Sequence, residues 1–146
     1  MRDYLIFVHQ KSFDAMLMIK PYLHVKKIKG KGRGVFTRAD IPARTVVEVS
    51  PVLVLSRKDT RYVDKTLLHN YIFLWGARST RTCLALGYCS LYNHSYDPNC
   101  IYEMDFEKEV MRIITRRKIK KGEELLINYN GDVHDRAPMW FPVRNS

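Results

Sequence analysis

Four short segments of the sequence contain residue types that could bind a ligand or do chemistry. Glycines alternate with basic residues in 30–36 (GKGRGVF), and such a turn can bring bare backbone close to a ligand because glycine has no side chain. Polar, turn-forming residues fill 92–100 (YNHSYDPNC), which contains the pattern NHSxxPN. The segment 122–129 (GEELLINY) ends an apolar stretch on a tyrosine, and 137–141 (APMWF) supplies two aromatic rings near the C-terminus.

Each segment taken alone also has a plainer interpretation. The glycine-rich segment suits a hairpin turn, and it lacks both the GxGxxG of a dinucleotide site and the Lys-Ser/Thr end of a P-loop. An asparagine–histidine pair is common in turns, a tyrosine often ends a strand at the rim of a core, and a terminal aromatic pair can plug a core. The order and spacing of all four segments together therefore carry more information than any one of them.

The elements that would position these segments are mostly short strands. Extended segments are predicted at 23–28, 45–55, 110–115 and 124–129, with Pro51 marking a bend or an edge. A short helix is predicted over 64–75 from the spacing of Leu67, Leu68, Tyr71 and Trp75. The 146 residues allow one domain, 1–146, with 1–18 as an N-terminal extension or strand and 130–146 as a C-terminal segment. The pattern predicts a mostly β fold with short helices.

Composition narrows the classes of protein further. No apolar run approaches the roughly 20 residues of a membrane span, and the apolar run 4–8 is too short for a signal peptide, so we expect a soluble intracellular protein. Three cysteines without a CxxC pair, Cys83, Cys89 and Cys100, argue against a disulfide framework and for reduced thiols.

The charge is large and uneven. The formal net charge is +10, and basic runs without an intervening acid lie between Asp14 and Asp40 and between Glu109 and Glu123. Such runs are solvated strand faces or a surface for nucleic acid. Four acids, Glu103, Asp105, Glu107 and Glu109, could form an acidic lip for a basic peptide.

In their order and spacing, the four segments resemble those of SET-domain protein lysine methyltransferases, over about residues 25–140. GKGRGVF is similar to the family's first cofactor loop, NHSYDPNC to its central asparagine–histidine motif, and GEELLINY to the segment that ends in the catalytic tyrosine. The compact size, with YIFLWG and LALGYCSLYNHS, is most similar to the minimal SET domains of viruses and bacteria. The resemblance implies a β-clip fold with knot-like C-terminal threading, S-adenosylmethionine on one face, and a substrate lysine entering from the other through a narrow channel.

The resemblance also implies roles for single residues. The cofactor-binding set comprises Gly32, Arg33, Gly34, Asn93, His94 and Trp140. Tyr129 matches the catalytic tyrosine, and Tyr102 matches a tyrosine of the lysine channel in some members, where it would assist catalysis. The channel is further expected to involve Tyr71 and Ile127, while Asn99 and Glu124 are expected to be mainly structural. The implied partners are a histone tail or another basic protein, an auxiliary DNA contact through the basic surface, and a second copy in a homodimer, in the cytoplasm or on chromatin in the nucleus.

The chemistry expected of these residues is alignment more than acid–base catalysis. Methyl transfer is an in-line displacement by a neutral amine on a sulfonium carbon, and a lysine with a pKa of about 10.4 must first lose a proton. A desolvated channel beside a positive sulfonium lowers that pKa. Tyr129 would need its own pKa to fall by about three units to act as a base at neutral pH, so solvent is expected to take the proton.

This sequence departs from the family pattern in three places. Position 96 is tyrosine where many members have a zinc-binding cysteine, and no cysteine follows Cys100, so no metal is expected and Trp140 must close the channel. The family's early channel tyrosine has no match within 48–51 (EVSP). Ile127 is smaller than the Phe or Tyr often found at that position, which allows higher methylation states.

Two other function classes remain compatible with these residues. One is a SET-fold binding module without activity, which the missing early tyrosine would favour and the intact Asn93, His94 and Tyr129 oppose. The other is a small basic β protein that binds nucleic acid, although its basic runs hold few aromatic rings for base stacking.

Overall fold

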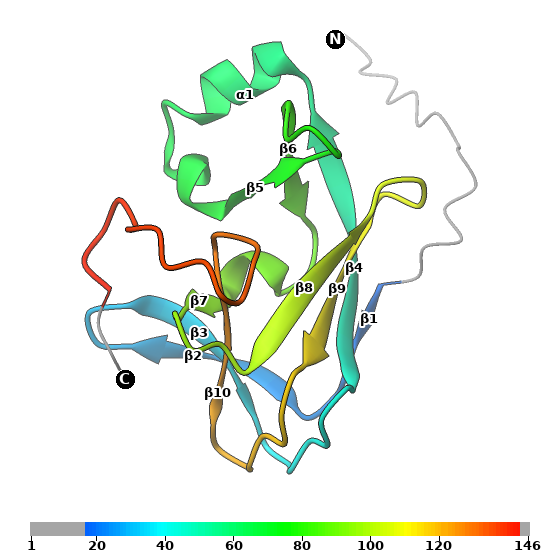
Figure 1. Ribbon diagram of the computed structural model, residues 1–146, viewed down its shortest axis with the longest axis vertical. Coiled ribbons are helices and arrows are strands. Elements are labelled where there is room, and N and C mark those ends of the chain that lie inside the picture. Colours follow the sequence, from blue (N-terminus) through cyan, green and yellow to red (C-terminus); the bar gives the residue numbers. More distant parts are fainter. Residues whose placement is uncertain (1–16, 144–146) are drawn as a thin grey trace, which may run out of the picture.

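The computed structural model describes residues 17–143, which form two β-sheets with short helices between strands (Figure 1). The larger sheet has six strands in the order β5-β6-β4-β9-β8, with β1 paired to β4. Its strands are β1 (Met18–Ile19), β4 (Val46–Leu55), β5 (Ile72–Trp75), β6 (Arg81–Ala85), β8 (Cys100–Asp105) and β9 (Val110–Thr115). The predicted mostly β fold with short helices is confirmed.

The smaller sheet brings the glycine-rich hairpin to the two motifs that follow it in the chain. Its order is β2-β3-β10-β7, from β2 (Leu23–Ile28), β3 (Gly32–Thr37), β10 (Glu124–Ile127) and β7 (Asn93–His94). β10 pairs antiparallel with β3 and parallel with β7, so Leu126 lies opposite Asn93 and Ile127 opposite His94. The knot-like threading stays a prediction.

The helices differ from the sequence prediction. The helix predicted over 64–75 is shorter than expected: a 3-10 helix η1 spans only Leu67–Tyr71, the strand β5 follows it, and α1 (Arg57–Val63) precedes it. α1 begins with a capping box, in which the Ser56 side chain accepts from the Asp59 amide and the Asp59 side chain accepts from the Ser56 amide. The apolar residues of 72–75 form a strand because they pair along β6. None of the helices within 17–143 is long and apolar enough to span a membrane.

Two strand predictions also need correction. Pro51 lies inside a central strand, where β4 passes from its pairing with β9 to its pairing with β6. The strand predicted to reach Tyr129 ends at Ile127, which leaves Asn128 and Tyr129 in a turn. The predicted N-terminal extension lies almost wholly outside the described residues, as do 144–146.

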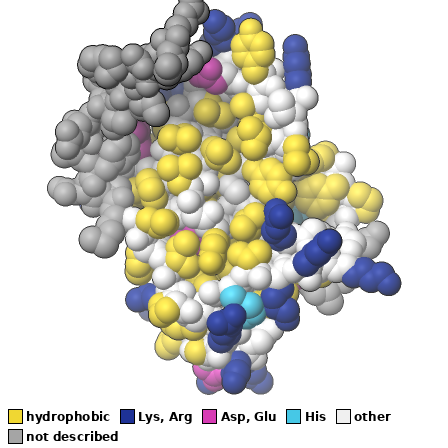
Figure 2. All heavy atoms as spheres, turned by 180° about the vertical axis from the view of Figure 1, so that it is seen from behind, with side chains coloured by type: hydrophobic (Ala, Val, Ile, Leu, Met, Phe, Trp, Pro, Cys, Tyr) yellow, Lys and Arg dark blue, Asp and Glu magenta, His cyan; other side chains and the backbone are white. Residues whose placement is uncertain are grey.

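The core lies between the sheets and ties the motif-bearing segments together. Its fully buried side chains come from both sheets and include Val35, Val47, Trp75, Met111, Ile113, Leu125 and Ile127. Cys83, Cys89 and Cys100 are buried free thiols. Figure 2 shows that hydrophobic side chains also gather on the face opposite to that of Figure 1.

Candidate active site

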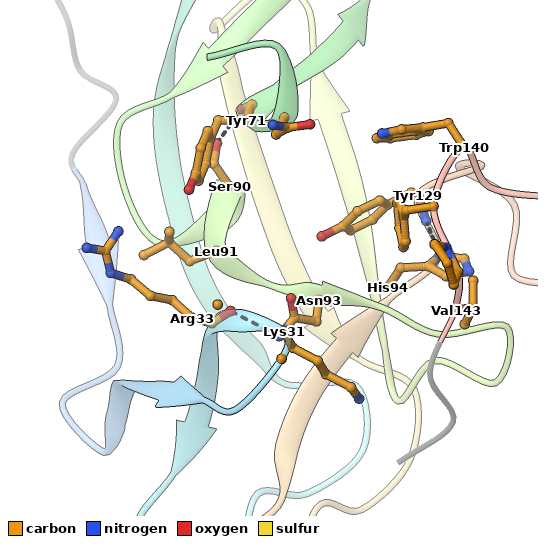
Figure 3. A pocket seen from close by; sticks show the side chains of 15 residues that line it. Lys31, Arg33, Tyr71, Ser90, Leu91, Asn93, His94, Tyr129, Trp140 and Val143 are labelled. Atoms are coloured by element: carbon orange, nitrogen blue, oxygen red, sulfur yellow. Dashed lines mark hydrogen bonds between the residues drawn. The ribbon is translucent and has the colours of Figure 1, made fainter. Parts of the chain in front are cut away.

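A hollow of about 430 Å³ lies where the small sheet, the 3-10 helices η1 and η2 (Cys89–Leu91) and the C-terminal segment meet (Figure 3). In Figure 3, Tyr71 and Ser90 line one side, Tyr129 and Trp140 line the opposite side, and Asn93 lies between them. The remaining lining residues are Gly30, Lys31, Gly32, Arg33, Asn70, Leu91, His94, Phe141, Pro142 and Val143. The hollow is thus built from all four segments that the sequence singles out.

Asn93 joins the glycine-rich strand to β10. Its Nδ2 donates to Glu124 Oε1 at 2.6 Å and to the Arg33 carbonyl at 3.0 Å. No hydrogen bond among the described residues uses Oδ1, which is therefore available to a ligand. Gly34 lies directly beneath this pair: a Cβ there would overlap Glu124 Oε1 and lie 2.9 Å from Asn93 Nδ2. A larger residue at 34 would therefore force the Glu124 and Asn93 side chains to shift.

His94 connects β7 to the turn that carries Tyr129, across 35 residues of sequence. Its Nδ1 accepts a hydrogen bond from the Tyr129 amide at 3.1 Å, so the ring proton resides on Nε2. Burial lowers the pKa of His94, which keeps the imidazole neutral at neutral pH. Nε2 is buried and has no hydrogen-bond partner among the described residues.

Tyr129 is held in place by its hydroxyl. The hydroxyl donates to the Tyr92 carbonyl at 2.7 Å, and the ring stacks on Trp140 with centroids 6.4 Å apart. Burial, followed by the nearby Glu124 and Tyr71, raises the pKa of Tyr129 to about 12. The phenol therefore keeps its proton at neutral pH, and its role in orienting the substrate stays a prediction.

Trp140 presents an aromatic face beside the hollow. Its side chain is 65% exposed, and the ring stands perpendicular to Phe141 with centroids 5.0 Å apart. Such a face suits a purine or a cation. Lys31 also lines the hollow, whereas the Arg33 side chain points away from Tyr129 in Figure 3, so Arg33 contributes its backbone.

The residues predicted for the substrate channel have different surroundings, and their channel roles stay predictions. Tyr71 lines the same hollow as the predicted cofactor residues. Tyr102 lies outside the lining, packed edge-on against Phe73 at 5.5 Å, and burial raises its pKa. Ile127 is fully buried in the core.

Several residues of the site are not among the sequence predictions. Ser90 lines the hollow and donates to the Tyr71 carbonyl at 2.7 Å, and Tyr92 supplies the carbonyl that receives the Tyr129 hydroxyl. The sequence around Ser90 and Tyr92 contains no pattern that predicts these two hydrogen bonds. Asn99 is structural, as expected, because its amide donates to the Glu124 carbonyl and accepts from the Leu126 amide, both at 2.8 Å.

Metal-binding residues do not cluster in the part of the chain that the structure describes. No group of three or more His, Cys, Asp or Glu side chains there could hold an ion. That the protein works without a metal stays a prediction.

The two sheets, the adjacent Asn93 and His94, and the tyrosine held beside them define a class of protein that comparison with known proteins identifies. The SET domain family model matches residues 32–130, and the chain belongs to this family. The predicted class, a protein-lysine N-methyltransferase, is confirmed by the family and by the names of the relatives. SET methyltransferases use S-adenosylmethionine as the methyl donor.

Three relatives illustrate the likeness. "Histone-lysine N-methyltransferase, H3 lysine-37 specific" of Schizosaccharomyces pombe is 36% identical over 125 residues, covering 85% of this chain and 80% of that protein. "Histone-lysine N-methyltransferase, H3 lysine-36 specific" of Gibberella zeae is 30% identical over 82% of this chain, which spans only 14% of that longer protein. A crystal structure of a candidate histone methyltransferase of Plasmodium falciparum superposes with a TM-score of 0.60 and 28% identity, covering 76% of this chain and 95% of that one.

Proposed function

We propose that this protein, as a single SET domain over 1–146, binds S-adenosylmethionine in the hollow and methylates a lysine in a histone tail or a similar basic segment. The observation that carries the proposal is the meeting of Gly32, Asn93, His94, Tyr129 and Trp140 around one hollow. These residues come from segments far apart in sequence, and together they offer bare backbone, a free amide oxygen and aromatic faces to one ligand.

The hollow fits the cofactor in size and chemistry. Its volume of about 430 Å³ lies within the usual range for small-molecule sites. The bare backbone around Gly32, the backbone of His94 and Asn93 Oδ1 would bind the polar groups of the cofactor, and the Trp140 ring would stack on its adenine or cover its sulfonium. When bound, S-adenosylmethionine supplies an electrophilic methyl group on a positively charged sulfur.

The residues of this chain then act by alignment. With the hydroxyl hydrogen of Tyr129 directed at the Tyr92 carbonyl, the oxygen lone pairs remain free to accept from the N–H groups of a lysine amine. That contact would orient the amine and leave its own lone pair free to attack. Burial raises the pKa of Tyr129 to about 12, so the phenol stays protonated and cannot take a proton from the amine. The amine would therefore lose its proton to water before the reaction.

Channel roles for Tyr71, Tyr102 and Ile127 are part of the proposal. The Tyr102 hydroxyl approaches the backbone of Gly131, just beyond Tyr129: a Cβ at Gly131 would lie 3.2 Å from it. This closeness supports Tyr102 as a second hydroxyl near the amine. Ile127 is sealed in the core, so its influence on the degree of methylation would pass through its neighbours.

The charge of the substrate suits part of the predicted acidic lip. Asp105 is paired with Arg112 at 3.3 Å and Glu109 is half-buried, so the attraction for a basic tail would come mainly from Glu103 and Glu107, both exposed on the β8–β9 hairpin. The relatives named as histone-lysine methyltransferases support a histone substrate and hence a place on chromatin in the nucleus.

An auxiliary DNA contact is best supported at the β2–β3 hairpin. In the second basic run, Arg112, Arg117 and Lys118 are each paired with an acid. In the hairpin, Lys27 lies directly opposite Arg33, an arrangement that destabilises a strand pair unless a polyanion neutralises it. We therefore expect Lys27→Ala/Lys29→Ala to weaken duplex binding and flatten its salt dependence, and Arg117→Ala/Lys118→Ala to change both less.

Mass spectrometry of histones and a tail-peptide array incubated with S-adenosylmethionine tests the function. Methylated lysine is the expected result. Normal cofactor binding without any methylated product would favour the inactive binding module, and light scattering of the purified chain tests the predicted homodimer.

A further inference from the structure

Glu48 is a buried carboxylate at the centre of the larger sheet. Its side chain is inaccessible to solvent, and it stands within the segment 48–51 that lacks the family's early tyrosine. Oε1 accepts from Ser50 Oγ at 2.6 Å, from the Tyr88 and Cys89 amides at 2.6 and 3.0 Å, and from Cys89 Sγ at 3.4 Å. Oε2 accepts from the Tyr92 hydroxyl at 2.9 Å. Every one of these contacts is a donor to the carboxylate.

The fold makes room for this arrangement. A Cβ at Gly87 would overlap both Ser50 Oγ and Glu48 Oε1, so the turn before η2 (Cys89–Leu91) can approach the carboxylate only with glycine at 87. Burying a carboxylate costs several kcal/mol of desolvation, and well-packed apolar side chains are often as stable or more so. Stability alone therefore does not explain a glutamate in the middle of this apolar strand.

The carboxylate is connected to Tyr129 through a single residue. Tyr92 donates its hydroxyl to Glu48 and receives the Tyr129 hydroxyl on its backbone carbonyl at 2.7 Å. Burial, and then the charge of Glu48, raises the pKa of Tyr92 well above its usual value, so the Tyr92 hydroxyl remains a donor. Residue 92 is thus fixed at both its ring and its carbonyl, one position before Asn93.

We propose that Glu48 is a positioning residue for methyl transfer, which through Tyr92 fixes the direction of the Tyr129 hydroxyl hydrogen. This inference rests on the proposed role of Tyr129. If the Tyr92 carbonyl shifts, the Tyr129 hydroxyl can turn and donate to the substrate amine. A donated hydrogen bond would occupy the amine lone pair that has to attack the methyl group. The two hydrogen bonds of Tyr92 would therefore keep this lone pair free.

Tyr92→Phe tests the inference because it removes one oxygen and keeps the buried ring. We expect kcat to fall by about 10-fold or more, as misalignment of reacting groups does, with the KM for peptide and the Kd for S-adenosylmethionine within about twofold of wild type. Thr115→Val is the matched control. It removes a buried hydroxyl that donates to the Pro42 carbonyl at 2.7 Å, at residues that do not line the hollow, so it should lower the melting temperature and keep kcat.

Substitutions of Glu48 give a second measurement. In Glu48→Gln, the amide oxygen can still accept from the Tyr88 and Cys89 amides and the amide nitrogen can donate to Tyr92, so it should keep more of kcat than Glu48→Ala. A wild-type kcat in Tyr92→Phe, a loss confined to cofactor affinity, or an equal loss of kcat in Thr115→Val would overturn the inference. An inactive wild-type enzyme would instead refute the proposed function.

Discussion

Replacing Gly34 with alanine tests whether the Asn93–Glu124 pair builds the cofactor site. The added Cβ would overlap Glu124 Oε1 and lie 2.7 Å from Ile28 Cδ1 and 2.9 Å from Asn93 Nδ2, where ordinary contacts begin at 3.4 Å. Asn93 and Glu124 must therefore separate or shift together. Overpacking of this kind costs about 1–3 kcal/mol of stability.

The effect on binding follows from the hydrogen bonds of Asn93. A hydrogen bond to a charged group contributes about 1.5–3 kcal/mol, so loss of the bond to Glu124 should weaken S-adenosylmethionine binding by about 10- to 100-fold through a misplaced Asn93. Isothermal titration calorimetry measures this directly on the folded variant.

Gly122→Ala provides the control. Gly122 has φ of 90° and open space around its Cβ position, in a turn outside the hollow, so alanine there costs about 1–2 kcal/mol of strain without touching the site. We expect it to lower the melting temperature and to leave cofactor affinity unchanged. Wild-type affinity in Gly34→Ala, or an equal loss in Gly122→Ala, would refute the reasoning.

Three further predictions follow from the site. Tyr129→Phe should abolish methyl transfer and leave the Kd for S-adenosylmethionine nearly intact; a variant that keeps most of its rate would show that Tyr129 is misassigned. The kcat/KM profile should rise with pH as the lysine amine loses its proton, with no fall from Tyr129 until its titration at about pH 12; a fall near neutral pH would contradict a protonated phenol. Burial lowers the pKa of His94, so its neutral form stabilises the fold fully above the unfolded pKa of about 6.5. This stabilisation is lost as pH falls through the lowered folded pKa. Urea unfolding of His94→Gln should therefore show less acid sensitivity than the wild type, and an unchanged pH dependence would refute the prediction.

The site could be predicted from the sequence wherever its residues lie within a contiguous motif. Asn93 and His94 are neighbours, and the NHSxxPN spacing is local, so their meeting with Tyr129 follows from the family's order of segments. The partners of Glu48 could not be predicted in the same way. Its acid stands out in the apolar run 45–55, but Tyr88, Cys89 and Tyr92 lie 40 to 44 residues away and only the fold brings them to it.

The wrong predictions of secondary structure also arise from contacts between segments distant in the sequence. The Ser56–Asp59 capping box is a readable helix start, yet the apolar spacing of 64–75 suggested a later helix. Ile72 to Trp75 form a strand because they pair antiparallel with β6, a contact between segments that the local sequence pattern does not encode. The distribution of charge could not be predicted either, because only the structure shows that Arg112, Arg117 and Lys118 are paired with acids.

The most direct test of the central claim is a single-turnover measurement with the enzyme saturated by S-adenosylmethionine and a basic histone-tail peptide. Mass spectrometry should show the methyl group on a lysine side-chain amine with wild-type protein, and none with Tyr129→Phe although the cofactor remains bound. A wild-type protein that binds the cofactor and leaves every lysine unmodified would contradict the account.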